Sequence, residues 1–186
     1  MSEVEKLTNA LDKHATLRNL ALAIVVCIVV IAIMGYATET LVYTVFGDTT
    51  MPDTRLWYSY GEILSAFIIL GPEGLQIWSQ VHLLDLLLPL AYSFSLVFGI
   101  LMELRVVLPD RRNLRQLGLL PLLAAIADYL ENTLIASQIA AYPNLSEPVI
   151  EVASVVTTTK WVLLGTSFAI VFFLLMLLIY NRAAKK

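Results

Sequence analysis

The chain has 186 residues, of which 59% are hydrophobic and 15% are charged, against about 25% charged residues in soluble domains. Its mean hydropathy of +0.79 argues against a soluble fold, because a domain of this size still exposes about a third of its unfolded surface. The net charge of −3 and the lack of a basic stripe argue against a nucleic-acid partner.

The N-terminal residues predict an amphipathic helix. Val4, Leu7, Leu11 and Leu17 recur on one side of a helical wheel, among charged residues. Such a helix either lies on the cytoplasmic membrane surface or extends the first membrane span. Of the two arrangements, we expect the extension.

Four apolar runs predict membrane spans at about residues 20–38, 81–102, 117–141 and 149–180. About 20 helical residues cross a hydrocarbon core of about 30 Å, and a segment in lipid must satisfy its own backbone hydrogen bonds. We therefore predict an all-α fold. It is an integral membrane four-helix bundle that forms a single transmembrane domain over residues 1–186.

The segment between the first two spans, residues 39–80, is expected to cap the outer side of the bundle. Ser59-Tyr60-Gly61-Glu62 fits a capping box, which starts a short interfacial helix. Gly71 ends this helix, and Pro72 begins another that we expect to run straight through the second span. The short helix is either an interfacial anchor or a lid over a cavity. Nearby aromatic residues are expected at the outer interface: Trp57, Tyr58, Tyr60 and Trp78.

The positions of the cations predict the orientation in the membrane. Basic residues gather before the first span, between the second and third spans, and after the fourth: Lys6, Lys13 and Arg18; Arg105, Arg111, Arg112 and Arg115; Arg182, Lys185 and Lys186. By the positive-inside rule these segments face the cytoplasm. Both termini are therefore expected on the cytoplasmic side.

Ionisable residues inside the spans mark a candidate site, because they are costly in lipid and usually face the interior of a bundle. We predict an intramembrane polar site of Asp85, Asp128, Glu131, Asn132 and Lys160, supported by His82, Tyr92 and Thr157. We expect the Lys160 amine within salt-bridge reach of Asp128 or Glu131. Asp85 should lie nearer the outer mouth with His82. Asn132 and Tyr92 should donate hydrogen bonds to this group of charged residues.

The charges of this site do not balance. Three carboxylates face one lysine, so the fully ionised site would carry about two excess negative charges, which a low-dielectric environment resists. The imbalance predicts a protonated carboxyl group or a bound cation. A metal site built from His82, Asp85, Asp128 and Glu131 is an alternative, but it has one histidine and a competing lysine, so we predict neither a metal nor a cofactor.

Several motifs resemble those of small, uncharacterised bacterial membrane proteins with four spans. They are Leu70-Gly71-x-x-Gly74, Asp85-x-x-x-Pro89-x-x-Tyr92, Asp128-x-x-Glu131-Asn132 and Thr159-Lys160-Trp161. The resemblance covers about residues 53–165. It implies the cytoplasmic (inner) membrane of a bacterium, and it implies no particular activity.

Three functional hypotheses follow from the polar site. The first is that it binds or translocates a proton, a cation or a small cationic or amphipathic molecule. The second is an intramembrane enzyme that acts on a lipid or isoprenoid by acid/base chemistry, with its catalytic residue unknown. The third is a structural or assembly subunit. The expected partners are the lipid bilayer, a small-molecule or lipid ligand and, for a transporter of only four spans, a second copy in a homodimer.

Overall fold

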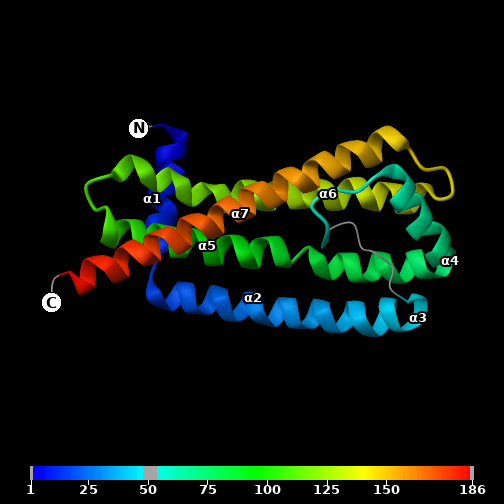
Figure 1. The fold of residues 1–186 in the computed structure, drawn as a ribbon, viewed down its shortest axis with the longest axis horizontal. Helices are drawn as coiled ribbons and strands as arrows, with labels where there is room; N and C mark the ends of the chain where they lie inside the picture. The colour runs from blue at the N-terminus through cyan, green and yellow to red at the C-terminus, as the bar shows by residue number, and fades with distance from the viewer. Residues whose placement is uncertain (1, 48–53, 185–186) are drawn as a thin grey trace.

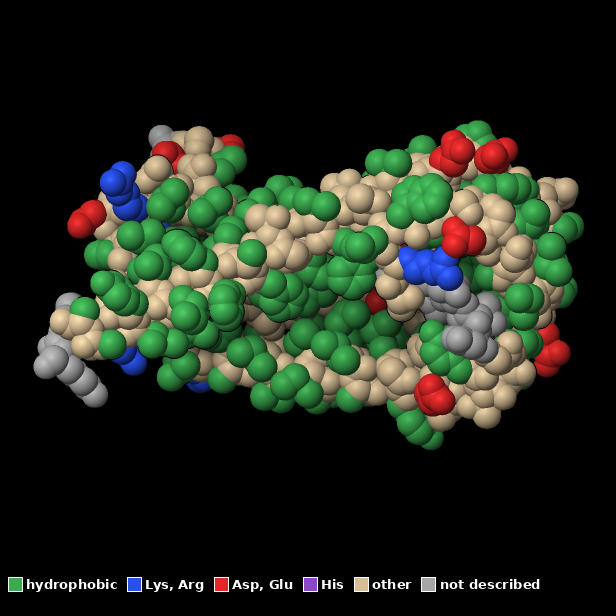
Figure 2. All heavy atoms as spheres, viewed as in Figure 1, with side chains coloured by type: hydrophobic (Ala, Val, Ile, Leu, Met, Phe, Trp, Pro, Cys, Tyr) green, Lys and Arg blue, Asp and Glu red, His purple; other side chains and the backbone are tan. Residues whose placement is uncertain are grey.

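The computed structural model describes residues 2–47 and 54–184, and over these residues the chain is helical and contains no strand. Four helical segments are long and apolar enough to cross a membrane: Leu17–Phe46, Tyr60–Val107, Arg112–Ala141 and Glu147–Ala183. The long helices lie side by side, and both ends of the chain lie at the same end of the molecule (Figure 1). Hydrophobic side chains cover most of the face shown in Figure 2, with charged side chains toward its two ends.

The N-terminal helix α1 (Glu3–His14) is separate from the first span, from whose end it turns away in Figure 1, and it packs against α5 (Leu88–Val107) and the 3-10 helix Arg112–Leu119. The predicted extension of the span is therefore wrong. The chain leaves helical geometry at Ala15, and Thr16 caps a new helix, α2 (Leu17–Thr38), by accepting a hydrogen bond from the Asn19 backbone N–H. A threonine whose hydroxyl satisfies a free amide favours a helix start over a helix interior.

The first span continues past α2 without a sharp break. A π-helical turn, Glu39–Tyr43, leads into the short helix α3 (Thr44–Phe46), which ends at Gly47 with a φ of 75°. The predicted boundary at residue 38 therefore marks the start of the π-helical turn rather than the end of the helix.

The short helix that the sequence predicts before Gly71 forms as expected. Helix α4 (Tyr60–Asp85) starts with the predicted capping box of Ser59 and Glu62, and it bends sharply at Gly71, where φ is 59°. A glycine adopts this left-handed backbone without the steric cost that a Cβ would add. The part before the bend packs inward, since Phe67 contacts the Trp78 ring at a centroid distance of 5.5 Å. Tyr58 and Trp78 are both buried in this core and do not project into the membrane interface.

The second span is not one straight helix. It breaks at Leu86 and Leu87, between α4 and α5 (Leu88–Val107), directly after Asp85. Pro89 lacks a backbone N–H, so the Asp85 carbonyl has no donor four residues on, and a helix with this defect bends or breaks. The predicted continuous helix from Pro72 is corrected to a discontinuous one.

The last two spans form the centre of the structure together with α5. A 3-10 helix (Arg112–Leu119) leads into α6 (Leu120–Ala141), and α7 (Glu147–Ala183) follows a short turn. Helices α5, α6 and α7 pack against one another, whereas α2 packs mainly along α5 and lacks close packing with α7. Buried Ala124 and Ala125 present small side chains within this packing, which allows a close approach of neighbouring helices.

Candidate functional site

The five predicted site residues come together in the interior. Asp85 ends α4, Asp128, Glu131 and Asn132 lie on α6, and Lys160 lies on α7, and each of these side chains is buried. We refer to these five residues as the acid–lysine cluster. Their spacing on α6, at positions i, i+3 and i+4, places three of them on one helical face.

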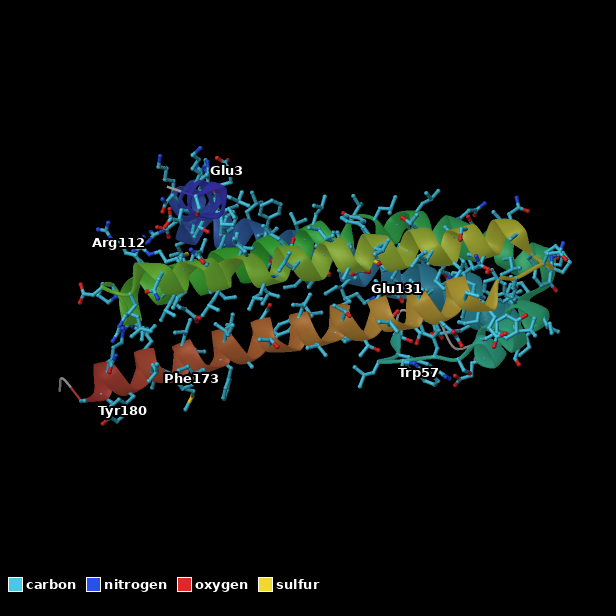
Figure 3. The ribbon with its side chains drawn as sticks, turned by 90° about the horizontal axis from the view of Figure 1, so that it is seen from above. Glu3, Trp57, Arg112, Glu131, Phe173 and Tyr180 are labelled. Atoms are coloured by element: carbon cyan, nitrogen blue, oxygen red, sulfur yellow. The ribbon has the colours of Figure 1, made fainter. Side chains whose placement is uncertain are left out.

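Lys160 pairs with two carboxylates of α6. Its Nζ atom lies 2.6 Å from Glu131 Oε2 and 3.4 Å from Asp128 Oδ1. Figure 3 shows Glu131 between α6 and α7. The ion pair expected from the sequence is therefore present, and the shorter contact makes Glu131 the main partner of the lysine among the described residues.

Neutral side chains donate hydrogen bonds to the carboxylates of Asp128 and Asp85. The Tyr92 hydroxyl donates to Asp128 Oδ2 at 3.0 Å, and the Asn132 amide donates to Asp85 Oδ2 at 2.8 Å. The sequence predicted that these two residues donate hydrogen bonds to the charged residues of the cluster. The structure assigns them to different carboxylates, because Tyr92 lies one to two turns into α5 whereas Asp85 lies before the helix break.

Two predicted supporting residues lie beside the cluster instead of within it. His82 Nε2 lies 3.0 Å from the Asn132 backbone oxygen and thus positions α6, without pairing with Asp85. The Thr157 hydroxyl lies 3.1 Å from the Tyr58 hydroxyl and donates to the Ala153 carbonyl at 2.9 Å. The partners of these two residues across helices depend on how each helix is rotated.

Some polar atoms of the cluster lack a partner. Glu131 Oε1 and Asn132 Oδ1 are buried without a hydrogen bond from any described residue, and so is the neighbouring Trp161 Nε1. Buried polar atoms are satisfied in the large majority of cases, and exceptions occur at functional sites. The Lys160 amine also lies 5.6 Å from the Trp161 ring centroid, within cation–π range.

A cavity of about 440 Å³ lies against the cluster. Asp85, Asp128, Tyr92 and Lys160 line one side of it, and apolar side chains line much of the rest: Ile31 and Met34 of α2, Leu88 of α5, and Trp161 and Leu164 of α7. Figure 2 shows a hollow between α7 and α2, with an acidic side chain at the bottom of the hollow. Glu131 does not line the cavity, so Asp85 and Asp128 are the two carboxylates of the cluster that face it.

Sequence reasoning missed part of this site. The α2 side chains that line the cavity belong to a uniformly apolar run, which carries no mark of whether a residue faces lipid or a cavity. It also placed Tyr58 at the outer interface, whereas this residue is buried and its backbone N–H donates a hydrogen bond of 3.0 Å to the Ser154 hydroxyl. A contact between residues so far apart in the chain leaves no local signal.

Within residues 2–47 and 54–184, no group of three or more His, Cys, Asp and Glu side chains is arranged to hold a metal ion. No family model, curated protein or solved structure matches this chain. Its function must therefore be inferred from the cavity and from the ionisable side chains that line it.

Proposed function

We propose that this protein binds a small cationic amphipathic molecule inside the membrane, at Asp85 and Asp128. The observation that carries the proposal is an excess of carboxylate on the wall of a mainly apolar cavity. The cavity volume of about 440 Å³ lies within the usual range of small-molecule sites, about 300–1,000 Å³. An apolar wall with a few acidic groups matches a ligand that has an apolar body and a positive charge.

The charge balance gives each residue a role. Lys160 neutralises Glu131, its nearest carboxylate, and approaches Asp128 at a longer distance. Asp85 has a neutral amide as its described hydrogen-bond partner, and it lines the cavity. Ionising it in a buried site is costly unless a cation compensates the charge. A bound cation provides this compensation, and a proton provides it when the ligand is absent.

The ligand reaches the site laterally from the bilayer. This route is supported by the position of the cavity, which is lined by α2 and α7, two helices that do not pack closely together. The basic termini and the Arg105–Arg115 segment support a cytoplasmic location for the opposite end of the molecule. The resemblance of the motifs to those of bacterial four-span proteins supports the inner membrane of a bacterium. The site then lies in the middle to outer part of the membrane.

Binding of a radiolabelled lipophilic cation, tetraphenylphosphonium, tests this function. The protein is reconstituted in lipid nanodiscs, and empty nanodiscs correct for partitioning into lipid. Asp85→Asn should weaken binding by about tenfold or more, because about 1.4 kcal/mol is a factor of ten and a buried charge pair is worth at least this much.

Two controls make the binding result specific. Glu73→Gln removes an exposed carboxylate from the same helix, and its affinity should equal that of the wild type. Tetraphenylborate has the same shape as the probe and the opposite charge, so it should not compete. Equal binding of the anion, or an unchanged affinity in Asp85→Asn, would contradict the proposal.

A second candidate function is an intramembrane enzyme that acts on a lipid or isoprenoid. It is favoured by the lateral position of the cavity, which places Asp128 within reach of a lipid, with Lys160 available to stabilise developing negative charge. The test is incubation of the reconstituted protein with bacterial polar lipids and isoprenoids, followed by mass spectrometry. A lipid converted by the wild type but not by Asp128→Asn would favour the enzyme.

A purely structural role for the cluster fits less well. That hypothesis predicts that Asp128, Glu131 and Lys160 are bonded to one another with no cavity beside them. The ion pairs are present, but the cavity of about 440 Å³ lies against two of the three residues. A network that served only packing would gain by filling this space, because unfilled volume costs stability.

A further inference from the structure

A further intramembrane carboxylate, that of Glu103, lies apart from the acid–lysine cluster. It belongs to α5 near the end that faces the termini, and its Oε2 atom is buried without a hydrogen-bond partner among the described residues. Glu103 lines a cavity of about 310 Å³, which we call the inner cavity, together with Ile24 and Cys27 of α2 and Phe168 of α7. An ionisable residue in a membrane span that faces a cavity is a site candidate by default.

The inner cavity and the cavity at the cluster meet at Tyr92. This residue lines both cavities, and its hydroxyl donates to Asp128. Both cavities lie between the same helices, α2, α5 and α7, and the hollow between α7 and α2 is visible in Figure 2. Because the two cavities share Tyr92 and these three helices, we infer that they join into one groove, with a carboxylate toward each end. At a rise of about 1.5 Å per residue, the groove extends for about 16 Å along α5 from Tyr92 to Glu103.

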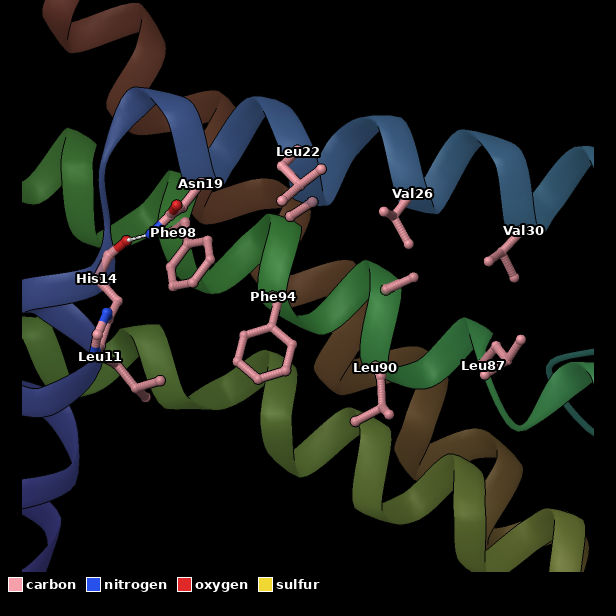
Figure 4. Close-up of a pocket in the computed structure, with 12 residues that line it drawn as sticks. Leu11, His14, Asn19, Leu22, Val26, Val30, Leu87, Leu90, Phe94 and Phe98 are labelled. Atoms are coloured by element: carbon pink, nitrogen blue, oxygen red, sulfur yellow. Dashed lines mark hydrogen bonds between the residues drawn. The ribbon is translucent and has the colours of Figure 1, made fainter.

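The opposite side of α2 lacks this pattern. A cavity of about 590 Å³ lies there between α1, α2 and α5, and its walls are mostly aliphatic and aromatic (Figure 4). Asn19, one of its two polar residues, already donates to the His14 carbonyl oxygen at 2.8 Å. Among the residues that the structure describes, no carboxylate lines this cavity. This side suits lipid chains, whereas the groove toward α7 offers a negative group at both ends.

We propose that the natural ligand is an elongated dication, with one cationic group at Asp85 and Asp128, the other at Glu103, and an apolar chain between them. This inference rests on the proposed function and names the class of molecule that the same site takes. Charge complementarity at both ends and an apolar middle carry it. A ligand with a single charge would leave the buried Oε2 atom of Glu103 without a partner.

Gly99 lies in the middle of the groove and keeps it open. A Cβ atom added there would have as its nearest neighbour Val171 Cγ2 at 4.0 Å, an ordinary contact, so alanine fits without strain. A longer side chain would extend into the inner cavity, which Gly99 lines. The Gly99→Leu substitution should therefore block the groove, and Gly99→Ala is its matched control.

The experiment measures displacement of tetraphenylphosphonium from the reconstituted protein by bis(trimethylammonium) alkanes with spacers from tetramethylene to hexadecamethylene. Affinity should peak at the decamethylene or dodecamethylene spacer, whose extended length suits the groove. At the peak, the dication should bind about tenfold more tightly than decyltrimethylammonium, a gain equivalent to about 1.4 kcal/mol. Glu103→Gln should bring this ratio close to one, whereas Glu73→Gln should preserve it.

The groove variants give an independent readout. Gly99→Leu should lower the affinity of the decamethylene dication more than that of the tetramethylene dication, and Gly99→Ala should not. Tetraphenylphosphonium binding without a spacer optimum, or an unchanged ratio in Glu103→Gln, overturns the dication inference alone. Absence of any tetraphenylphosphonium binding to the wild type overturns the proposed function itself.

Discussion

The protein contains two groups of ion pairs with opposite charge balance. Near the termini, Asp12 of α1 lies between Arg105 and Arg115, at 2.7 Å and 2.8 Å, so one carboxylate faces two cations. In the interior, Lys160 lies between Glu131 and Asp128, and Asp85 adds a third carboxylate to one amine. The first group is partly exposed, whereas the second is buried.

The surroundings decide what an unbalanced charge costs. The extra arginine near the termini can be solvated by water and lipid headgroups, and salt screens its field. The extra carboxylates of the acid–lysine cluster have no such solvent, so a proton or a cation must compensate them. An unequal number of acidic and basic groups therefore anchors α1 in one place and, in our proposal, forms a binding site in the other.

The largest effect on stability is expected from Glu131→Gln. This change removes the shortest partner of a buried lysine, and breaking a buried ion pair from one side costs about 3 kcal/mol or more. Unfolding of the purified protein in mixed detergent micelles measures the loss. Glu151→Gln, an exposed change on α7, should alter the unfolding free energy by less than about 0.5 kcal/mol. Equal stability of the two variants would contradict the expected cost of breaking the buried pair of Lys160 and Glu131.

A smaller loss is expected when both partners are replaced together. Lys160→Met with Glu131→Leu removes the amine and its nearest carboxylate at similar volume, so no lysine is left buried without its main partner. Replacing a buried pair by apolar groups is often neutral or stabilising. The same unfolding assay should therefore place the double variant above Glu131→Gln in stability. A double variant that is less stable than the single one would contradict the assigned pairing.

The smallest effect is expected at the other group of ion pairs. Asp12→Asn weakens the contacts to both arginines, and partly exposed pairs contribute about 1 kcal/mol or less. The loss should shrink further at high salt, unlike the loss in Glu131→Gln. Unfolding at low and at high ionic strength measures the loss of unfolding free energy and its dependence on salt. An Asp12→Asn variant that loses as much stability as Glu131→Gln, independently of salt, would remove the contrast between the two groups.

The features that could be predicted from the sequence have local signals. Uninterrupted apolar runs predict the four long helices, and the pattern from Ser59 to Glu62 followed by Gly71 predicts the start and the bend of α4. The ion pair of Lys160 with the α6 acids also followed from residue type and depth alone, because ionisable groups in apolar helices have few partners to choose from.

Other features depend on relations between helices, which the sequence does not show. Pro89 permits either a bend or a break, and the structure breaks the span two residues before it. His82 and Thr157 share a depth with the cluster, but the rotation of their helices turns them toward the Asn132 backbone and Tyr58. Glu103 lies one residue beyond the apolar run that predicts the second span. The sequence therefore does not indicate that this residue lines a cavity.

The central claim is that the excess carboxylate of the acid–lysine cluster holds a proton, and that a cation replaces it. Infrared difference spectroscopy of the reconstituted protein, before and after addition of tetraphenylphosphonium, tests this exchange directly. We expect the carbonyl band of a protonated carboxylic acid to disappear when the cation binds, and we expect this band to be absent from the Asp85→Asn difference spectrum. A difference spectrum without a carboxylic acid band, or with the same band in Asp85→Asn, would contradict the claim.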